Sequence, residues 1–144
     1  MKLTVKHFSE LTTDELYKIY KVRTEVFVVE QNCPYQEVDE DDLRAYHIFF
    51  SEDGEIKAYL RMFEHDETTA RIGRVLATDR GKGLGKAIVS EGIKAAGEKL
   101  RKTNILIEAQ TYIIPMYEKL GFKVISDEFL DVGIPHRKMI LKNI

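Results

Sequence analysis

The sequence predicts a single α/β domain in which a mixed β-sheet is covered by helices, and three observations support this fold class. The chain has 144 residues, a length that fits one hydrophobic core. Apolar residues make up 44% of it, enough to fill that core. Strand-like and helix-like patterns are interspersed along the whole chain without a repeat or a linker, which favours a sheet flanked by helices.

Short runs that alternate in polarity or are rich in β-branched and aromatic residues predict the strands. These runs are Lys2–Phe8, Ala45–Ser51, Glu55–Glu64, Thr69–Thr78, Ile105–Ile107, Phe122–Ile125 and Lys138–Leu141. Asp53 and Gly54 separate the second run from the third, and this dipeptide favours a two-residue hairpin turn. The second and third strands are therefore expected to pair directly.

Apolar residues at helical spacing predict three helices. The first follows Thr12 and Glu15, which have capping-box spacing, and is expected to end near Gln31. The second and third cover Gly83–Arg101 and Tyr112–Leu120, the latter stopped by a glycine.

Composition excludes several classes of partner and compartment. The net charge is only −2 with 32% charged residues, so no basic field exists to recruit nucleic acid or an anionic membrane. Cys33 is the only cysteine, which rules out an intrachain disulfide and fits a reducing compartment. The N-terminal residues lack a signal-peptide pattern, and no apolar run reaches the length of a membrane span. We therefore expect a cytoplasmic protein.

The loop that joins the fourth predicted strand to the second helix carries the most specific signal. It reads Arg80-Gly81-Lys82-Gly83-Leu84-Gly85-Lys86. A helix N-terminus offers unpaired N–H groups and a partial positive charge to a phosphate, and glycines let the phosphate approach the backbone. The three basic side chains add positive charge around the same point. The alternative is a flexible turn whose basic residues serve solubility.

Two commoner glycine-rich motifs do not match this loop. The dinucleotide fingerprint G-x-G-x-x-G requires a third glycine where Lys86 or Ile88 stands. The P-loop requires a Ser or Thr where Ala87 follows Lys86. The remaining pattern is R-x-x-G-x-G at a strand–helix junction.

At this loop the sequence resembles the GNAT superfamily of acyl-CoA-dependent N-acetyltransferases. Arg80–Gly85 is similar to the superfamily's pyrophosphate loop, and a second similar element follows at Pro115–Phe122. Flanking segments resemble the ElaA-like branch, and these are Val26–Gln31, Ala109–Thr111 and Gly133–His136. Ala77 stands where many members carry proline, a change that leaves backbone pairing intact.

The resemblance implies a mixed, mostly antiparallel central sheet flanked by helices, and acetyl-CoA or another acyl-CoA as co-substrate, with no metal. It also implies a small-molecule or peptide amine as acceptor, and it allows a homodimer. Residues implied to bind the acyl-CoA are Val75, Leu76, Ala77, Arg80, Gly81, Lys82, Gly83, Leu84, Gly85, Lys86 and Gln110. Gln110 has an equal alternative, which is to satisfy an open sheet edge.

Transfer to an amine needs an oxyanion stabiliser and an acid for the leaving thiolate. Backbone N–H groups near Val75–Ala77 serve as the first if the strand bulges there. Tyr117, matched to the family motif, is the expected general acid. The alternative is a packing role, because Tyr117 shares helical core spacing with Ile113, Met116 and Leu120.

The sequence does not single out one general base, and a chain of water molecules would also remove the proton. The candidates are Glu30, Asp39, His47, Glu108 and His136. For His47 and His136 the alternative is a hydrogen-bonded structural histidine.

The acidic segment Glu37–Asp42 lacks the glycine and the terminal glutamate of a calcium loop. We expect a solvated surface loop, with attraction of a cationic amine as the sharper alternative. Cys33 is interpreted as a small hydrophobic residue, and Tyr35 is left undecided.

Two functions remain open for the chain as a whole. One is acyl transfer from acyl-CoA to a primary amine by direct attack. The other is a non-catalytic module that keeps the CoA cleft as a sensor or interaction surface. Tyr117 favours the enzyme, because a binder needs no proton donor.

Overall fold

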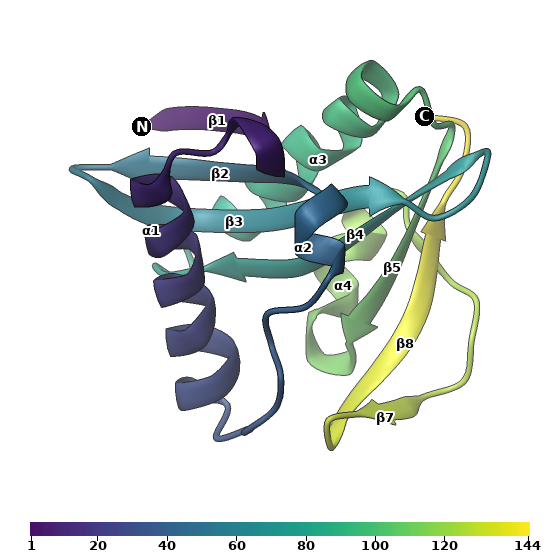
Figure 1. Ribbon diagram of the computed structural model, residues 1–144. Coiled ribbons are helices and arrows are strands. Elements are labelled where there is room, and N and C mark those ends of the chain that lie inside the picture. The colour runs from purple at the N-terminus through teal and green to yellow at the C-terminus, as the bar shows by residue number, and fades with distance from the viewer.

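The computed structural model describes residues 1–144 and has a central eight-stranded sheet with helices on both faces (Figure 1). The strand order is β1-β2-β3-β4-β5-β8-β6, and β7 pairs with β8. The strands are β1 Lys2–His7, β2 Tyr46–Glu52, β3 Glu55–Glu64, β4 Thr69–Ala77, β5 Asn104–Gln110, β6 Lys123–Val124, β7 Phe129–Asp131 and β8 Ile134–Leu141. Every pair is antiparallel except β4 with β5, so the predicted mixed, mostly antiparallel sheet is confirmed.

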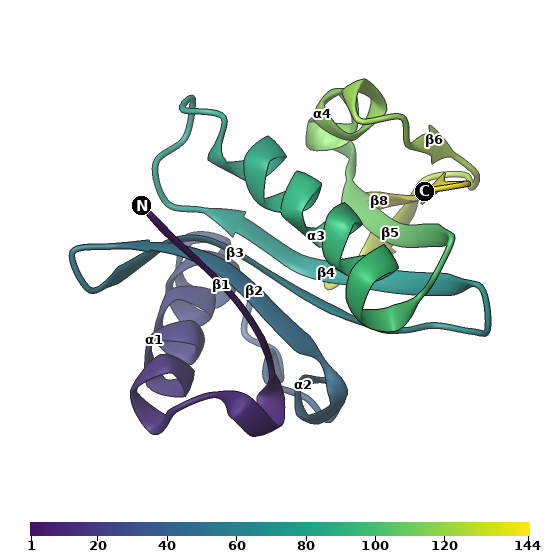
Figure 2. The same cartoon turned by 90° about the horizontal axis from the view of Figure 1, so that it is seen from above.

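The helices divide between the two faces of the sheet (Figure 2). α1 and α2 cover one face, and α3 and α4 cover the other. Their bounds are α1 Thr13–Arg23, α2 Asp41–Arg44, α3 Leu84–Leu100 and α4 Ile114–Lys119. Short 3₁₀ segments span Phe8–Glu10 and Thr111–Ile113. None of these helices combines the length and the apolar character needed to cross a membrane.

Each face of the sheet carries its own hydrophobic core because side chains alternate along the strands. Leu60 and Met62 of β3 point into the larger core, which lies under α3. Tyr59, which precedes Leu60 in sequence and points to the opposite face, belongs to the smaller core with Ile19 of α1. Each helix layer therefore buries the apolar residues of one strand face.

The first helix changes its type partway along. Thr12 and Glu15 form the predicted capping box, with Thr12 Oγ1 accepting from the Glu15 N–H at 3.1 Å. After Arg23 the chain continues as a π-helix over Thr24–Glu30, and the helical stretch ends where the sequence predicted, near Gln31. π-helical turns recur at functional sites, and this one leads into the segment that covers one side of the cleft described below.

β4 and β5 pair only over their first three residues and then separate. They pair only through Thr69–Arg71 and Asn104–Leu106. Beyond that point Ile72–Ala77 and Ile107–Gln110 are not paired with each other, so the middle of the sheet opens into a V. The backbone groups that a neighbouring strand would satisfy there are free for a ligand.

Several sequence predictions hold and others fail. The β2–β3 hairpin turns at Asp53 and Gly54, both in the left-handed region at φ 52° and 77°, as that dipeptide predicts. β7 and α2 were missed because three- and four-residue elements carry too little pattern. The last strand begins at Ile134, ahead of the predicted Lys138.

Candidate active site

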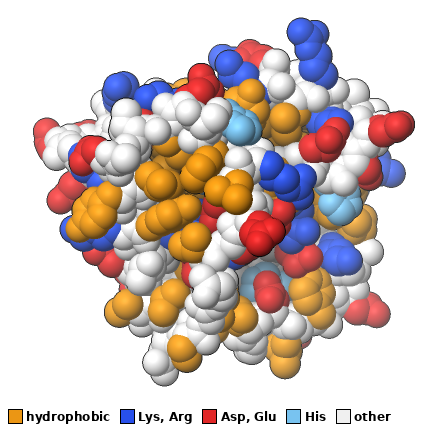
Figure 3. All heavy atoms as spheres, in the orientation of Figure 1, with side chains coloured by type: hydrophobic (Ala, Val, Ile, Leu, Met, Phe, Trp, Pro, Cys, Tyr) orange, Lys and Arg blue, Asp and Glu red, His pale blue; other side chains and the backbone are white.

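A cleft of about 760 Å³ occupies the V between β4 and β5. Small-molecule sites in proteins have volumes in this range. Its walls come from β4, the Asp79–Gly83 loop, the start of α3, β5, α4, the β7–β8 hairpin, the π-helix and the segment that follows the π-helix. On the face shown in Figure 3, acidic and basic side chains are mixed and apolar side chains gather beside α1.

The loop that leads into α3 leaves eight consecutive amide groups without a partner. No N–H from Asp79 to Lys86 donates a hydrogen bond to the protein, and the first helical bond in α3 runs from the Ala87 N–H to the Gly83 carbonyl at 3.0 Å. Gly81 and Gly83 have φ of 82° and 74°, a conformation that favours glycine. Such a row of donors at the N-terminus of a 17-residue helix suits a phosphate group.

β4 bulges where it borders the cleft. Arg61 of β3 lies opposite Gly73, and Tyr59 lies opposite Leu76, so Arg74 and Val75 together stand opposite one residue of β3. A bulge of this kind turns backbone groups away from the ladder. The expected irregularity near Val75 is therefore present.

Tyr117 reaches the cleft from α4 on the same side as the loop. The side chain is 5% exposed and packs edge-on against Phe122, with ring centroids 5.7 Å apart. Burial, followed by the influence of Tyr112, raises the pKa of the Tyr117 hydroxyl above its ordinary value, so the group remains protonated at neutral pH. A protonated phenol bordering the cleft can donate a proton or a hydrogen bond to a ligand.

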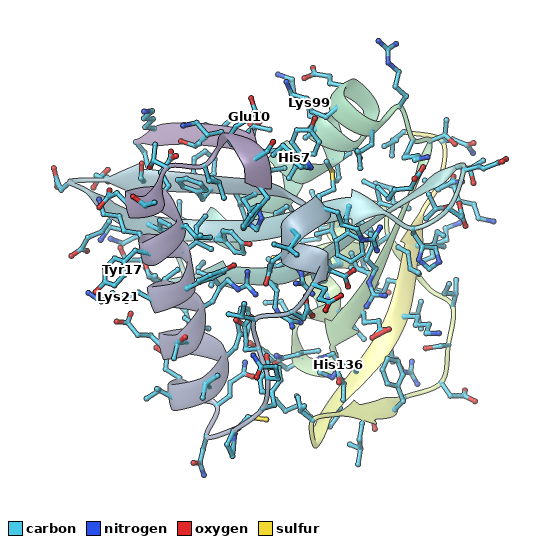
Figure 4. The ribbon with its side chains drawn as sticks, in the orientation of Figure 1. His7, Glu10, Tyr17, Lys21, Lys99 and His136 are labelled. Carbon is cyan, nitrogen blue, oxygen red and sulfur yellow. The ribbon has the colours of Figure 1, made fainter.

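Two of the five candidate bases line the cleft, Glu108 of β5 and His136 of β8. Glu108 is paired with Arg71 at 3.1 Å. His136, labelled in Figure 4, holds Nδ1 2.6 Å from the Ile134 carbonyl oxygen and stacks on Phe129. Because a carbonyl only accepts, Nδ1 carries the proton and Nε2 is left as the basic nitrogen.

The other three candidates do not line the cleft. Glu30 is exposed and lies 3.5 Å from Arg80. His47 is fully buried between the Tyr59 hydroxyl at 2.7 Å and the Asp42 carbonyl at 3.0 Å, and burial lowers its pKa. It is the structural histidine that the sequence left as an alternative.

Asp39 belongs to a closed ring of three arginines and three carboxylates, which we call the arginine–carboxylate ring. Its members alternate in charge around the ring in the order Arg23, Glu37, Arg74, Asp39, Arg61 and Asp42. Arg23 and Asp42 are fully buried, and their closest atoms, Nη1 and Oδ1, are 2.6 Å apart. The ring joins α1, the linker before α2, α2 itself, β3 and the β4 bulge.

The prediction that Glu37–Asp42 forms a solvated loop is therefore wrong. Glu37 is 4% exposed and Asp42 is fully buried. Burial alone would raise the pKa of Asp42, but the hydrogen bond and charge of Arg23 outweigh it and hold that pKa below the usual range. The carboxylates are occupied by arginines within the protein, which removes the basis for an electrostatic attraction of substrate.

Most of the residues expected to hold the acyl-CoA border the cleft. These are Val75, Leu76, Ala77, Arg80, Gly81, Gly83, Leu84, Gly85, Lys86 and Gln110. Lys82 does not, because its side chain is 70% exposed and lies 3.8 Å from Asp79. Gln110 lies opposite His136 in the β5–β8 pairing.

Sequence reasoning missed Lys119, Arg71 and Arg74, which also border the cleft. Lys119 lies inside the Pro115–Phe122 element, so that motif offered a signal for it. The two arginines lie on β4 ahead of the glycine loop, and no local pattern distinguishes them from surface residues.

The chain thus combines a split mixed sheet with an open glycine loop at the start of a helix. Comparisons with known proteins assign the family. A sequence profile described as an acetyltransferase (GNAT) domain matches residues 9–143. The chain belongs to the GNAT acetyltransferase family. The resemblance stated from the motifs is thus confirmed, including its ElaA-like branch.

The relatives cover nearly the whole chain. An acyl-CoA N-acyltransferase from Pseudomonas aeruginosa has a solved structure with a TM-score of 0.90 at 37% identity, covering 97% of this chain and 99% of that one. The structure of ElaA from Escherichia coli gives a TM-score of 0.91 at 30% identity, again covering 97% and 99%. A UPF0039 protein of Schizosaccharomyces pombe is 37% identical over 146 residues, which span 99% of this chain and 97% of the relative.

Proposed function

We propose that this chain transfers an acetyl group from acetyl-CoA to a primary amine by direct attack, with Tyr117 as general acid. The observation that carries the proposal is the composition of the cleft. The Asp79–Lys86 loop, with its unpaired amide groups, borders one side of it, and a buried, protonated phenol reaches it from α4. The first feature suits a pyrophosphate and the second suits a leaving thiolate, and acetyl-CoA carries both groups.

The loop binds the pyrophosphate through its backbone. Asp79–Lys86 offers N–H donors at the positive end of α3, while Arg80 and Lys86 add charge from side chains that border the cleft. The pantetheine arm then runs along the unpaired edge of β4 at Ile72–Ala77, which accepts an extended chain as a strand would. This placement brings the thioester to the β4 bulge.

The reaction needs one bond made and one broken. The amine nitrogen attacks the thioester carbonyl carbon, and the Val75 N–H at the bulge stabilises the charge that develops on the oxygen. The carbon–sulfur bond then breaks. The amine proton goes to Nε2 of His136, directly or through water, and the thiolate takes its proton from Tyr117.

The raised pKa of Tyr117 does not disqualify it as the acid. A thiol ordinarily titrates at about 8.5 and a tyrosine at about 10. Burial in one cleft disfavours both anions, so the difference between them stays small while the phenol remains fully protonated before the reaction. The hydroxyl is therefore available when charge forms on sulfur.

Tyr117→Phe tests the proposal because it removes only the hydroxyl and keeps the ring that packs on Phe122. We expect kcat to fall by about 10²–10⁴-fold while acetyl-CoA affinity changes little. The assay is release of free CoA thiol with polyamines, amino acids and peptides, run as single turnovers so that product release does not limit the rate. Tyr17→Phe, an exposed residue of α1 labelled in Figure 4, is the matched control.

Two results would count against this function. A folded Tyr117→Phe protein with wild-type single-turnover rate removes Tyr117 as the acid. Wild-type protein that binds acetyl-CoA but releases no thiol with any amine of the panel favours the non-catalytic sensor.

A further inference from the structure

Arg74 has an unusual backbone conformation for its position. Its φ is 53°, in the left-handed region, and it lies within a strand at the β4 bulge. The other non-glycine residues with positive φ lie at turns, at the end of α3 or near the C-terminus. Glycine is the residue favoured for the left-handed position of such a bulge, because a Cβ is strained there. An arginine at this position indicates that its side chain is needed.

The Arg74 side chain is bound to the linker that precedes α2. Nη2 donates to the Glu37 carbonyl at 2.8 Å and lies 3.3 Å from Oδ2 of Asp39. Nε lies 2.6 Å from Oε2 of Glu37, without the alignment of a hydrogen bond. The guanidinium also lies 5.9 Å from the ring centroid of Tyr35, a residue that borders the cleft. One side chain therefore joins the bulge to both ends of the Tyr35–Asp39 segment.

That segment is itself fixed by the rest of the arginine–carboxylate ring. Glu37 is held by Arg23 of α1, with Nε 3.0 Å from Oε2. Asp39 is held by Arg61 of β3, with Nη1 2.6 Å from Oδ1. Because β3 is paired on both sides within the sheet, Arg74 ties the bulge to parts of the fold that do not border the open V.

We propose that Arg74 is a positioning residue that fixes the β4 bulge, so that the Val75 N–H is aimed at the thioester carbonyl. The inference rests on the function proposed above. Beyond Arg71 the cleft side of β4 has no strand neighbour to hold it, so the side chain of Arg74 supplies the restraint that a neighbouring strand would give. The planar guanidinium suits this role because it contacts a carbonyl and two carboxylates at once, which an ammonium group cannot do in the same geometry.

Two substitutions separate this role from a purely structural one. Arg74→Gly removes the side-chain contacts to Glu37 and Asp39 and at the same time relieves the backbone strain. Arg74→Lys keeps the positive charge but loses the planar guanidinium that contacts several acceptors at once. Arg44→Ala is the control, because Arg44 also binds a carboxylate and a carbonyl but lies outside the cleft. The readouts are the single-turnover rate with a generic primary amine, acetyl-CoA affinity by calorimetry, and the infrared C=O stretch of bound ¹³C-acetyl-CoA.

For Arg74→Gly we expect the single-turnover rate to fall about 10–100-fold, because misplacing an N–H that donates a hydrogen bond in the transition state costs about this much. Acetyl-CoA affinity should stay within about 3-fold, since the pyrophosphate loop is untouched. The carbonyl stretch, lowered on binding to the wild type by the N–H bond, should return toward its value in water. Arg74→Lys should show a smaller change in the same direction, and Arg44→Ala none.

Two outcomes contradict different claims. If wild-type protein and Arg74→Gly lower the C=O stretching frequency of bound acetyl-CoA equally and have the same single-turnover rate, Arg74 does not position the bulge. If wild type binds acetyl-CoA without any change in the stretch, the proposed function fails and this inference fails with it. If Arg74→Gly does not fold, Arg74→Lys tests the inference by the same readouts. A C=O stretching frequency and a single-turnover rate equal to those of the wild type in Arg74→Lys would then overturn the inference.

Discussion

The arginine–carboxylate ring and the Asp79–Lys86 loop both concentrate polar groups, but only the groups of the ring have partners within the protein. Each carboxylate of the ring has two arginine neighbours inside the protein. No amide of the loop has a protein partner. Polar groups that the fold satisfies hold its parts together, whereas polar groups that it leaves open beside a cleft are available to a ligand.

The largest expected effect comes from breaking the ring. Asp42→Asn leaves Arg23 and Arg61 short of a counter-charge, and removing one partner of a buried pair costs about 3–5 kcal/mol. Urea unfolding at neutral pH measures the loss. Asp41→Asn is the matched control, because Asp41 pairs with Arg44 on the surface and should lose less than about 0.5 kcal/mol. Equal losses in the two variants would show that the ring is energetically no different from a surface pair.

The ring also predicts how stability depends on pH. Burial tends to raise the pKa of Asp39 and of Asp42, but hydrogen bonds from Arg61 and Arg23 outweigh it, so both folded-state pKa values lie below the usual range. A carboxyl whose pKa is lowered by folding stabilises the protein above the unfolded value of about 3.9, and that contribution disappears as the pH falls through the folded value.

The stability difference between wild type and Asp42→Asn should therefore stay constant from pH 7 to about pH 5 and shrink below about pH 4. Urea unfolding across this range measures it. A difference that already shrinks near pH 6, or that persists unchanged at the lowest pH at which both proteins fold, would contradict a lowered pKa for Asp42.

Local patterns predicted the open site better than the ring. Closely spaced glycines at a strand–helix junction mark the open loop within a few residues of sequence, and Asp53-Gly54 marked its hairpin in the same way. The ring depends on pairs such as Arg23 with Glu37 and Asp39 with Arg61, which are 14 and 22 residues apart. Six charged residues from four parts of the chain carry no joint periodicity, so five acids within the six residues Glu37–Asp42 predicted a solvated surface loop.

Tyr117 and the candidate bases also differ in whether a local sequence pattern could predict them. The motif around Tyr117 predicted a residue that does border the cleft. The sequence offered five candidate bases and did not rank them. The structure separates Glu108 and His136 from the other three, because these two line the cleft and the sheet register places His136 opposite Gln110. Positions that depend on strand pairing across the sheet are not available from a local pattern.

The central claim is that the unpaired amides of the loop bind the acetyl-CoA pyrophosphate, and calorimetry of acetyl-CoA binding to Gly83→Val tests it most directly. Gly54→Val is the matched control, since both glycines have φ near 75° and neither would bring a Cβ within 3.5 Å of its neighbours. Both should therefore lose similar stability. We predict that Gly83→Val weakens binding by about 10–30-fold, or about 1.4–2 kcal/mol, and that Gly54→Val binds as the wild type does. Wild-type affinity in folded Gly83→Val would contradict the claim.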